Sequence, residues 1–349
     1  MKEVKIALIG FGNAGQAFAE MLLEQEQAIE EQYGARVLTV AILTKTRGNL
    51  SDPEGIDLGK ALGDLKTAGR FDEADVLSEP ITGQSAAEQL DYDVLIELTP
   101  LEFASGKTAT DHIGAALKRG RHAITANKGP LAWSCKSLRD LAKANHCQFL
   151  YETTVMDGTP IFNLQRAALP LCRITAIKGI LNSTTNYILE ETAKGNAMED
   201  IIAEGQKRGF VEADPADDIE GYDAAVKITV LANVLMDADL TPLDIDRKGI
   251  EGITKEDLDQ AAKNGNTIKL LCSAYWEDGR VKGKVAPEEI SKEDLYASLE
   301  GTSSVVTLTT DLMGTISVIE ERPEIQQTAY GIFSDLLTLI RAAHFRRKT

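Results

Sequence analysis

The chain has 349 residues, with 37 Lys and Arg against 54 Asp and Glu, and hence a formal net charge of −17. This length exceeds what one hydrophobic core usually spans, so we expect two domains. The excess of acidic residues argues against a nucleic-acid partner, because phosphate backbones bind basic surfaces.

The cysteines and the apolar runs suggest where the protein resides. The four cysteines lie far apart with no Cys-x-x-Cys pair, and the N-terminus passes into a strand-like run without a signal peptide. We therefore expect a cytoplasmic protein with reduced thiols. No apolar run reaches the roughly 20 residues that a membrane span needs, so no membrane association is expected.

The first part of the chain alternates between strand-like and helical patterns. Strand-like runs lie at residues 4–9, 37–43, 94–98, 123–126 and 148–151, with helical patterns from the first run to about residue 32 and at 112–119, and a loop with one short helix at 46–71. This alternation predicts an α/β fold, with a Rossmann-type doubly wound parallel sheet over residues 1–150.

Beyond residue 150 the pattern changes. Strand-like runs lie at 173–181, 268–276 and 305–309, and one long helical stretch covers about 186–236. We expect a second, α+β domain over residues 151–325, whose sheet could pair subunits. Residues 326–345 look helical, so 326–349 are assigned to the first domain as a returning helix.

A glycine-rich turn follows the first strand-like run. It reads G-F-G-N-A-G, at Gly10, Phe11, Gly12, Asn13, Ala14 and Gly15. A position after a strand and before a helix favours dinucleotide binding over a merely structural turn. The first glycine permits the turn, the second lets the backbone approach a pyrophosphate and the third allows close helix packing, while the helix N-terminus supplies partial positive charge.

The end of the second strand-like run bears on the choice of cofactor. NAD-selective sites place a carboxylate there to bind the ribose diol, but this run ends in L-T-K-T-R. Lys45 and Arg47 could pair with the 2′-phosphate of NADP, which favours NADP over NAD. The alternative is that both are solvated loop cations.

An acidic segment leads to a lysine at the start of an apolar helical stretch. Six carboxylates lie between Gly209 and Lys227. Asp223 and Lys227 are spaced i, i+4 and therefore share one helix face. The alternative is a solvated acidic loop followed by a helix whose first-turn carboxylates complement its dipole. Burying an unpaired lysine is costly, however, so we expect a functional role.

Two further motifs lie at predicted strand ends. The sequence T-A-N-K-G-P-L-A at 125–132 places Lys128 where ligands bind in open α/β sheets, although an ordinary surface lysine is the alternative. The sequence Y-E-T-T-V-M-D-G-T-P at 151–160 combines Glu152 with an irregular turn whose carbonyls could bind a hard cation, with a structural hinge as the alternative.

Together these motifs resemble homoserine dehydrogenase, in its short form lacking a C-terminal ACT regulatory domain. The resemblance covers nearly the whole chain, and it also includes L-T-P at 98–100 and G-I-L-N-S-T-T-N-Y-I-L at 179–189. It implies reversible oxidation of L-homoserine to L-aspartate 4-semialdehyde with NADP or NAD, in the threonine and methionine branch of biosynthesis. It also implies a homodimer whose second domain binds substrate.

The same resemblance implies residue roles. Lys227 and Asp223 match the family's catalytic pair, and Lys128 matches the lysine between nicotinamide and substrate. Glu212, Asp218 and Thr184 match substrate contacts, Thr99 and Asn127 match cofactor contacts, and Glu152 with the carbonyls of Val155, Asp157 and Thr159 matches a site for a monovalent cation such as Na⁺. The four histidines lie outside these motifs, so a lysine is expected to take the substrate proton, and both Lys128 and Lys227 are candidates.

Two departures from the family pattern leave other functions open. Ser183 stands where the family usually has glycine, and the acidic run at 320–324 replaces a glycine-rich turn near the cofactor. A catalytically silent NADP-binding sensor is therefore conceivable. A second alternative is an acylating semialdehyde dehydrogenase, which would need a cysteine nucleophile and a histidine base, and Cys135 and His146 are the candidate pair.

Overall fold

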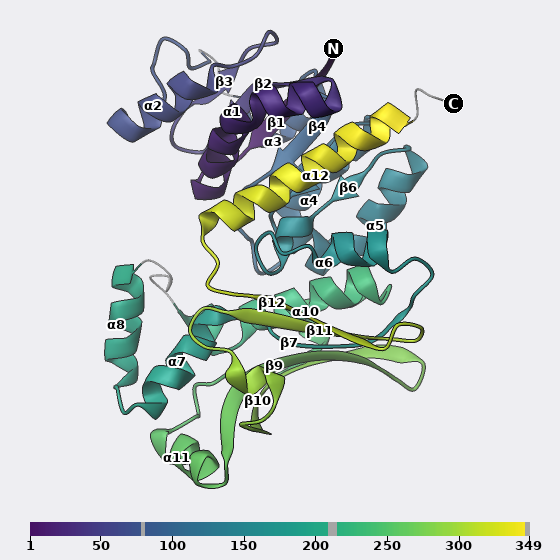
Figure 1. Ribbon diagram of the computed structural model, residues 1–349. Helices are drawn as coiled ribbons and strands as arrows, with labels where there is room; N and C mark the ends of the chain where they lie inside the picture. The colour runs from purple at the N-terminus through teal and green to yellow at the C-terminus, as the bar shows by residue number, and fades with distance from the viewer. Residues whose placement is uncertain (78–80, 209–214, 346–349) are drawn as a thin grey trace. The chain divides into compact units, whose positions relative to one another are not determined.

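A computed structural model describes residues 1–77, 81–208 and 215–345, and it divides the chain into two units (Figure 1). Unit 1 comprises Met1–Pro130, Ser134–Pro160 and Glu324–Thr349, and unit 2 comprises Leu131–Trp133 and Ile161–Pro323. Unit 1 thus continues past the expected boundary at 150 and includes the C-terminal helix. Within the described ranges, no helix is both long and apolar enough to cross a membrane.

Unit 1 is built on a six-stranded sheet with the order β3-β2-β1-β4-β5-β6. The strands are β1 (Lys2–Ile9), β2 (Ala35–Leu43), β3 (Asn49–Ser51), β4 (Val94–Glu97), β5 (His122–Thr125) and β6 (Phe149–Leu150). All neighbours pair in parallel except β3, which is antiparallel to β2. The predicted doubly wound parallel sheet is therefore confirmed, and β3 adds an antiparallel strand at its edge. The connection from β2 to β3 is too short for the crossover that a parallel pair needs, and the Asn49 side chain closes it by accepting from the Thr44 amide.

Helices cover both faces of this sheet, as a doubly wound fold requires. They are α1 (Asn13–Tyr33), α2 (Leu58–Ala68), α3 (Gly83–Gln89), α4 (Lys107–Lys118), α5 (Gly129–Ala144) and α12 (Ile325–Phe345). One core cluster joins β1 to α1, α2 and α12, and a second joins the sheet to α3 and α4 through small alanines. The helix expected to return to the first domain is α12, which packs along α1 (Figure 1).

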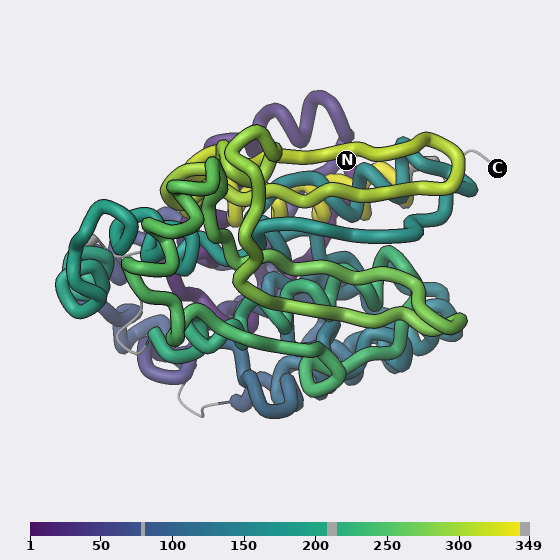
Figure 2. Tube along the Cα trace, turned by 90° about the horizontal axis from the view of Figure 1, so that it is seen from below, coloured from purple at the N-terminus to yellow at the C-terminus, as the bar shows by residue number. Residues whose placement is uncertain are grey.

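Unit 2 is built on a second sheet, with the order β12-β11-β7-β9-β10-β8. Its strands are β7 (Ile174–Ile180), β8 (Ile245–Arg247), β9 (Asn266–Glu277), β10 (Arg280–Ser291), β11 (Ser304–Thr310) and β12 (Thr315–Glu320). Every pair is antiparallel except β10 with β8. Figure 2 shows strands of this sheet side by side, with the teal β7 between the yellow pair β11 and β12 and the green pair β9 and β10.

The helices of unit 2 differ from the expectation of one long helical stretch. The stretch is divided into α7 (Ser183–Ala193), α8 (Met198–Arg208), α9 (Ala216–Ile219) and α10 (Tyr222–Leu235), and α6 (Ile161–Asn163) and α11 (Lys255–Lys263) complete the set. Gly221 has φ +80° and ends the short helix α9 before α10 begins. Helical periodicity alone did not reveal these breaks. Their effect is to bring the starts of α7 and α10 together beside β9.

Candidate active site

Lys227 and Asp223 form an ion pair on the first turns of α10. The Nζ of Lys227 lies 2.8 Å from Oδ2 of Asp223 and donates to the carbonyl of Leu181, also at 2.8 Å. The side chains are 19% and 10% exposed, so solvent screens this pair less than a surface pair. The spacing seen in the sequence therefore produces a fixed, partly buried ammonium group.

Asn182 links the ion pair to a second carboxylate. It is the N-cap of α7, and its Oδ1 accepts from the Thr185 amide at 2.9 Å. Its Nδ2 donates to Asp218 at 2.6 Å and to Asp223 at 2.9 Å. Asn182 was missed in the sequence, although an Asn immediately before a helical pattern is a recognisable cap signal.

Asp218 and Thr184 lie within this arrangement, and their role as substrate contacts stays a prediction. Burial raises the pKa of the Asp218 carboxyl above its usual value, and the nearby charge of Asp223 raises it further. Hydrogen bonds from Asn182 and Thr184 and the charge of Lys227 oppose this shift. A cationic group placed here would favour the ionised form of Asp218.

Cys272 of β9 lies close to the same cluster but is chemically quiet. Complete burial raises the pKa of its thiol to about 12, although a backbone hydrogen bond from Leu181 and the charge of Lys227 act in the opposite direction. At neutral pH it is a protonated thiol and hence a poor nucleophile.

The glycine-rich turn of unit 1 has the geometry of a pyrophosphate site. Gly10 has φ +100°, and a Cβ on it would lie 2.5 Å from the carbonyl oxygen of Leu98. A Cβ on Gly12 would meet nothing within 4 Å, and Gly12 caps α1 without a side-chain hydrogen bond. The backbone at the start of α1 is therefore accessible to an anionic group, which fits a dinucleotide cofactor.

Arg47 lies beside this turn. Its Nη1 donates to the carbonyl of Phe11 at 3.0 Å, while its own amide donates to Thr44 Oγ1 at 2.9 Å. Lys45 is exposed to solvent. The side chain held near the turn is thus Arg47, and the guanidinium is the group suited to bidentate recognition of a phosphate.

The carboxyl ends of β4 and β5 are joined through Asn127. Its Nδ2 donates to the carbonyls of Thr99 at 3.0 Å and Pro100 at 3.2 Å, and its Oδ1 accepts from the Gly129 amide at 2.9 Å. Lys128 follows Asn127 in the chain and is half-buried at the start of α5. The L-T-P and T-A-N-K motifs therefore meet at the sheet edge where ligands bind in this fold class.

The irregular turn after β6 contains Glu152, which is 1% exposed. Met156 and Asp157 have φ +58° and +48°, so the turn carrying the carbonyls of Val155, Asp157 and Thr159 is sharply bent. The Glu152 amide donates to Asp335 of α12 at 2.8 Å, a partner that the sequence did not reveal. A buried carboxylate beside such a turn fits a hard cation. Over the described part of the chain, no group of three or more His, Cys, Asp and Glu side chains forms a metal cluster.

Two sequence hypotheses have other outcomes. Glu212 lies outside the described residues. Cys135 lies near the middle of α5 and His146 lies beyond its end, so the intervening part of the helix alone separates them by about 13 Å at 1.5 Å per residue. That separation is far beyond hydrogen-bond reach, so the cysteine and histidine pair of an acylating dehydrogenase is wrong.

Comparison with known proteins identifies the family. Residues 10–152 match the NAD-binding domain of homoserine dehydrogenase, and residues 160–337 match the homoserine dehydrogenase domain. An NAD(+)-dependent homoserine dehydrogenase of Pseudomonas canavaninivorans is 31% identical over 98% of both chains. A homoserine dehydrogenase of Methanocaldococcus jannaschii is 34% identical over 95% of this chain and 97% of the relative.

Solved structures agree with this assignment. A hyperthermophilic archaeal homoserine dehydrogenase in complex with NADPH has a TM-score of 0.82 and 26% identity, over 96% of this chain and 97% of that one. The fold, the glycine-rich turn and the lysine and aspartate pair thus occur in a chain that matches the family along nearly its whole length. The chain belongs to the homoserine dehydrogenase family.

Proposed function

We propose that this protein catalyses the reversible oxidation of L-homoserine to L-aspartate 4-semialdehyde, with reduction of NADP or NAD and release of one proton. The observation that carries the proposal is the Lys227–Asp223 pair, held by Leu181 and Asn182 in a member of this family. The reaction would belong to the threonine and methionine branch of biosynthesis in the cytoplasm.

The substrate would bind with its ammonium group against the carboxylates near α7 and α10. Asp218 is the described candidate, and Thr184 and Asn182 orient its carboxylate. Both donate hydrogen bonds to that carboxylate, which fixes the direction of its remaining lone pairs. Glu212 is proposed as a second ammonium contact on the resemblance alone.

The substrate hydroxyl would bind at the ammonium group of Lys227. The bound nicotinamide supplies the hydride acceptor, and Gly10 to Gly15 would hold its pyrophosphate. Asp223 fixes the lysine Nζ and favours its charged form, which suits stabilisation of the substrate oxygen as negative charge develops there.

Two lysines qualify as the acceptor of the hydroxyl proton. Lys227 would have to be neutral first, which its contact with Asp223 opposes, and Lys128 is the alternative in unit 1. The pH profiles of kcat for Lys128→Met and Lys227→Met distinguish them. The variant that retains residual activity but loses the ionisation on the rising limb identifies the base.

Both NADP and NAD are cofactors within this family, and we propose that this chain prefers NADP. The position of Arg47 beside Phe11 supports the proposal, because its guanidinium could extend to a 2′-phosphate. A kcat/KM for NAD that exceeds the value for NADP would refute it.

We also propose that Glu152 and the carbonyls of Val155, Asp157 and Thr159 bind Na⁺ or a similar monovalent cation. The buried position of Glu152 beside the bent turn that carries these carbonyls supports this, since carboxylate and carbonyl oxygens are the ligands that hard cations prefer. Replacing NaCl by a bulky organic cation at constant ionic strength should lower activity in the wild type. Glu152→Gln should lose this response.

A homodimer is proposed through unit 2. Its strands β9 and β12 expose Tyr275, Trp276 and Ile319, apolar side chains that a subunit contact would bury. Sedimentation at micromolar concentration should give twice the chain mass, and a monomer at every concentration would contradict the proposal.

One assay tests the function itself. Homoserine is added to the protein with NADP or NAD, and absorbance of the reduced cofactor is followed. We expect homoserine-dependent reduction with at least one cofactor. Tight cofactor binding without any homoserine-dependent turnover would instead support a silent sensor.

A further inference from the structure

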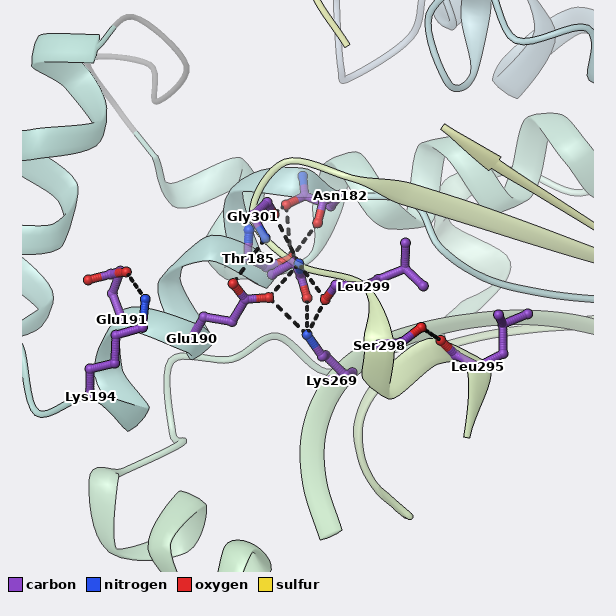
Figure 3. Close-up of polar contacts among 11 residues, drawn as sticks. Asn182, Thr185, Glu190, Glu191, Lys194, Lys269, Leu295, Ser298, Leu299 and Gly301 are labelled. Carbon is purple, nitrogen blue, oxygen red and sulfur yellow. Dashed lines mark hydrogen bonds and ion pairs between the residues drawn. The ribbon is translucent and has the colours of Figure 1, made fainter. Parts of the chain in front are cut away.

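A buried lysine outside the proposed reaction centre binds three acceptors at once. Lys269 of β9 has a side chain that is 4% exposed. Its Nζ donates to Asn186 Oδ1 at 2.7 Å, to Leu299 O at 2.7 Å and to Glu190 Oε1 at 3.0 Å (Figure 3). An ammonium group has three donors, so its hydrogen-bonding capacity is filled.

Two of these acceptors, Asn186 and Glu190, are also bonded to each other and to Gly301. Asn186 Nδ2 donates to Glu190 Oε1 at 3.0 Å and to Gly301 O at 2.9 Å, and Gly301 N donates to Glu190 Oε2 at 2.9 Å. The cluster therefore ties one side of α7 to β9 and to the 299–301 segment before β11, as the dashed lines of Figure 3 show. Because Lys269 and Asn186 are buried and the cluster is mutually bonded, it resists displacement of the helix.

The same helix begins with the groups that hold the proposed catalytic pair. Asn182 caps α7 through Thr185, the neighbour of Asn186, and donates to both Asp218 and Asp223. The Leu181 carbonyl, immediately before the cap, accepts from Lys227. A shift or rotation of the first turn of α7 would therefore move an acceptor of Lys227 and the donor to Asp223 together.

We propose that Lys269 is a positioning residue for this reaction, which fixes the first turns of α7 through Asn186 and so sets the geometry of Lys227 and Asp223. The inference rests on the proposed function. Lys269 need not touch substrate or cofactor, so its effect would be on the rate of the chemical step, which is sensitive to displacements of about 1 Å.

A purely structural ion pair would behave differently. Removing one partner of a buried pair leaves an uncompensated charge, but replacing both partners by apolar residues of similar size often restores stability. The double substitution K269M/E190M removes both charges while it keeps unbranched side chains. The Oδ1 of Asn186 would still lose its donor in this variant, so α7 would lose the contact that we propose is required for positioning.

The experiment compares wild type, K269M, K269M/E190M and K255M. Lys255 is the matched control, because it is a partly exposed lysine of unit 2 that pairs with Asp259. Folding of unit 2 is followed by tryptophan fluorescence in urea, since Trp133 and Trp276 both belong to this unit. For each folded variant, kcat and the KM for cofactor are measured with saturating homoserine.

We expect K269M to lower the urea midpoint, and K269M/E190M to regain most of it. In the double variant kcat should remain about 10- to 100-fold below wild type with an unchanged cofactor KM, the effect of a misplaced rather than a missing catalytic group. K255M should match wild type in all three quantities.

Three results would overturn the inference. The first is a wild-type kcat in the folded double variant, which would make the cluster a replaceable ion pair. The second is a rise in cofactor KM that alone accounts for the lost rate. The third is failure of both variants to fold, which would make Lys269 a residue of the fold only. Absence of homoserine oxidation in the wild type would instead refute the proposed function, and the two failures are thereby distinguished.

Discussion

Replacing Asn182 by alanine tests how the site of unit 2 is held together. The substitution removes the N-cap of α7 and the two amide donations, to Asp218 at 2.6 Å and to Asp223 at 2.9 Å. Both carboxylates remain in place but accept fewer hydrogen bonds. The loss of the cap and of these hydrogen bonds should therefore lower the stability of unit 2 and change the position of Lys227.

The expected size follows from these contacts. Loss of an Asn cap costs about 1 kcal/mol, and a hydrogen bond to a charged group is worth about 1.5–3 kcal/mol. The lower end applies to each carboxylate, because Asp223 keeps Lys227 and Asp218 keeps Thr184. Asn182→Ala should therefore reduce the free energy of unfolding of unit 2 by about 4 kcal/mol.

Urea unfolding followed by tryptophan fluorescence measures this loss, since both tryptophans lie in unit 2. Asn182→Ser is the matched control, because serine also caps helices but lacks the side-chain amide that reaches Asp218 and Asp223. Compared with Asn182→Ala, the serine variant should recover about 1 kcal/mol of stability and little of the lost kcat. Stability of Asn182→Ala within about 1 kcal/mol of wild type would refute the reasoning.

Three further predictions concern the two units separately. Gly12→Val should raise the cofactor KM with little change in Tm, because a side chain there enters open space. Gly10→Ala should instead lower Tm, because Gly10 has a positive φ and lies close to Leu98. Equal effects of the two substitutions on Tm would contradict this prediction. Arg47→Ala should raise KM for NADP more than for NAD, and parallel changes in the two would remove Arg47 from a phosphate site. The pKa of Asp218 is raised above 3.8, so its carboxyl takes up a proton at a higher pH in the folded protein than in the unfolded chain. The KM for homoserine should therefore rise as the pH falls through the folded-state pKa, because the protonated carboxyl no longer attracts the substrate ammonium group. Asp218→Asn should have a high KM that does not vary over this pH range, and it should stabilise the protein at neutral pH, where the ionised carboxyl is disfavoured.

Local sequence patterns are sufficient to predict much of unit 1. The glycine-rich turn, the apolar strands and the helix that returns at the C-terminus each depend on short stretches of sequence. The antiparallel β3 was missed because three residues are too few to show a period. Its orientation depends on the length of the turn and on Asn49.

The candidate site of unit 2 was predictable only in part. The i, i+4 spacing of Asp223 and Lys227 predicted their contact, because a helix fixes that distance. The contacts of Asn182 with Asp223 and of Lys269 with Asn186 could not be inferred, because the partners are 41 and 83 residues apart in the chain. Such contacts arise from tertiary packing, which no local period encodes.

The most direct test of the account is kcat for homoserine oxidation by Lys227→Met, measured beside Lys255→Met and together with cofactor binding. The account predicts a loss of about 100-fold or more in kcat for Lys227→Met, the contribution typical of a group that handles a proton or stabilises an oxyanion. Cofactor affinity should be unchanged, because the glycine-rich turn belongs to unit 1. A turnover like that of wild type in folded Lys227→Met would contradict the assignment of Lys227 and Asp223 as the catalytic pair.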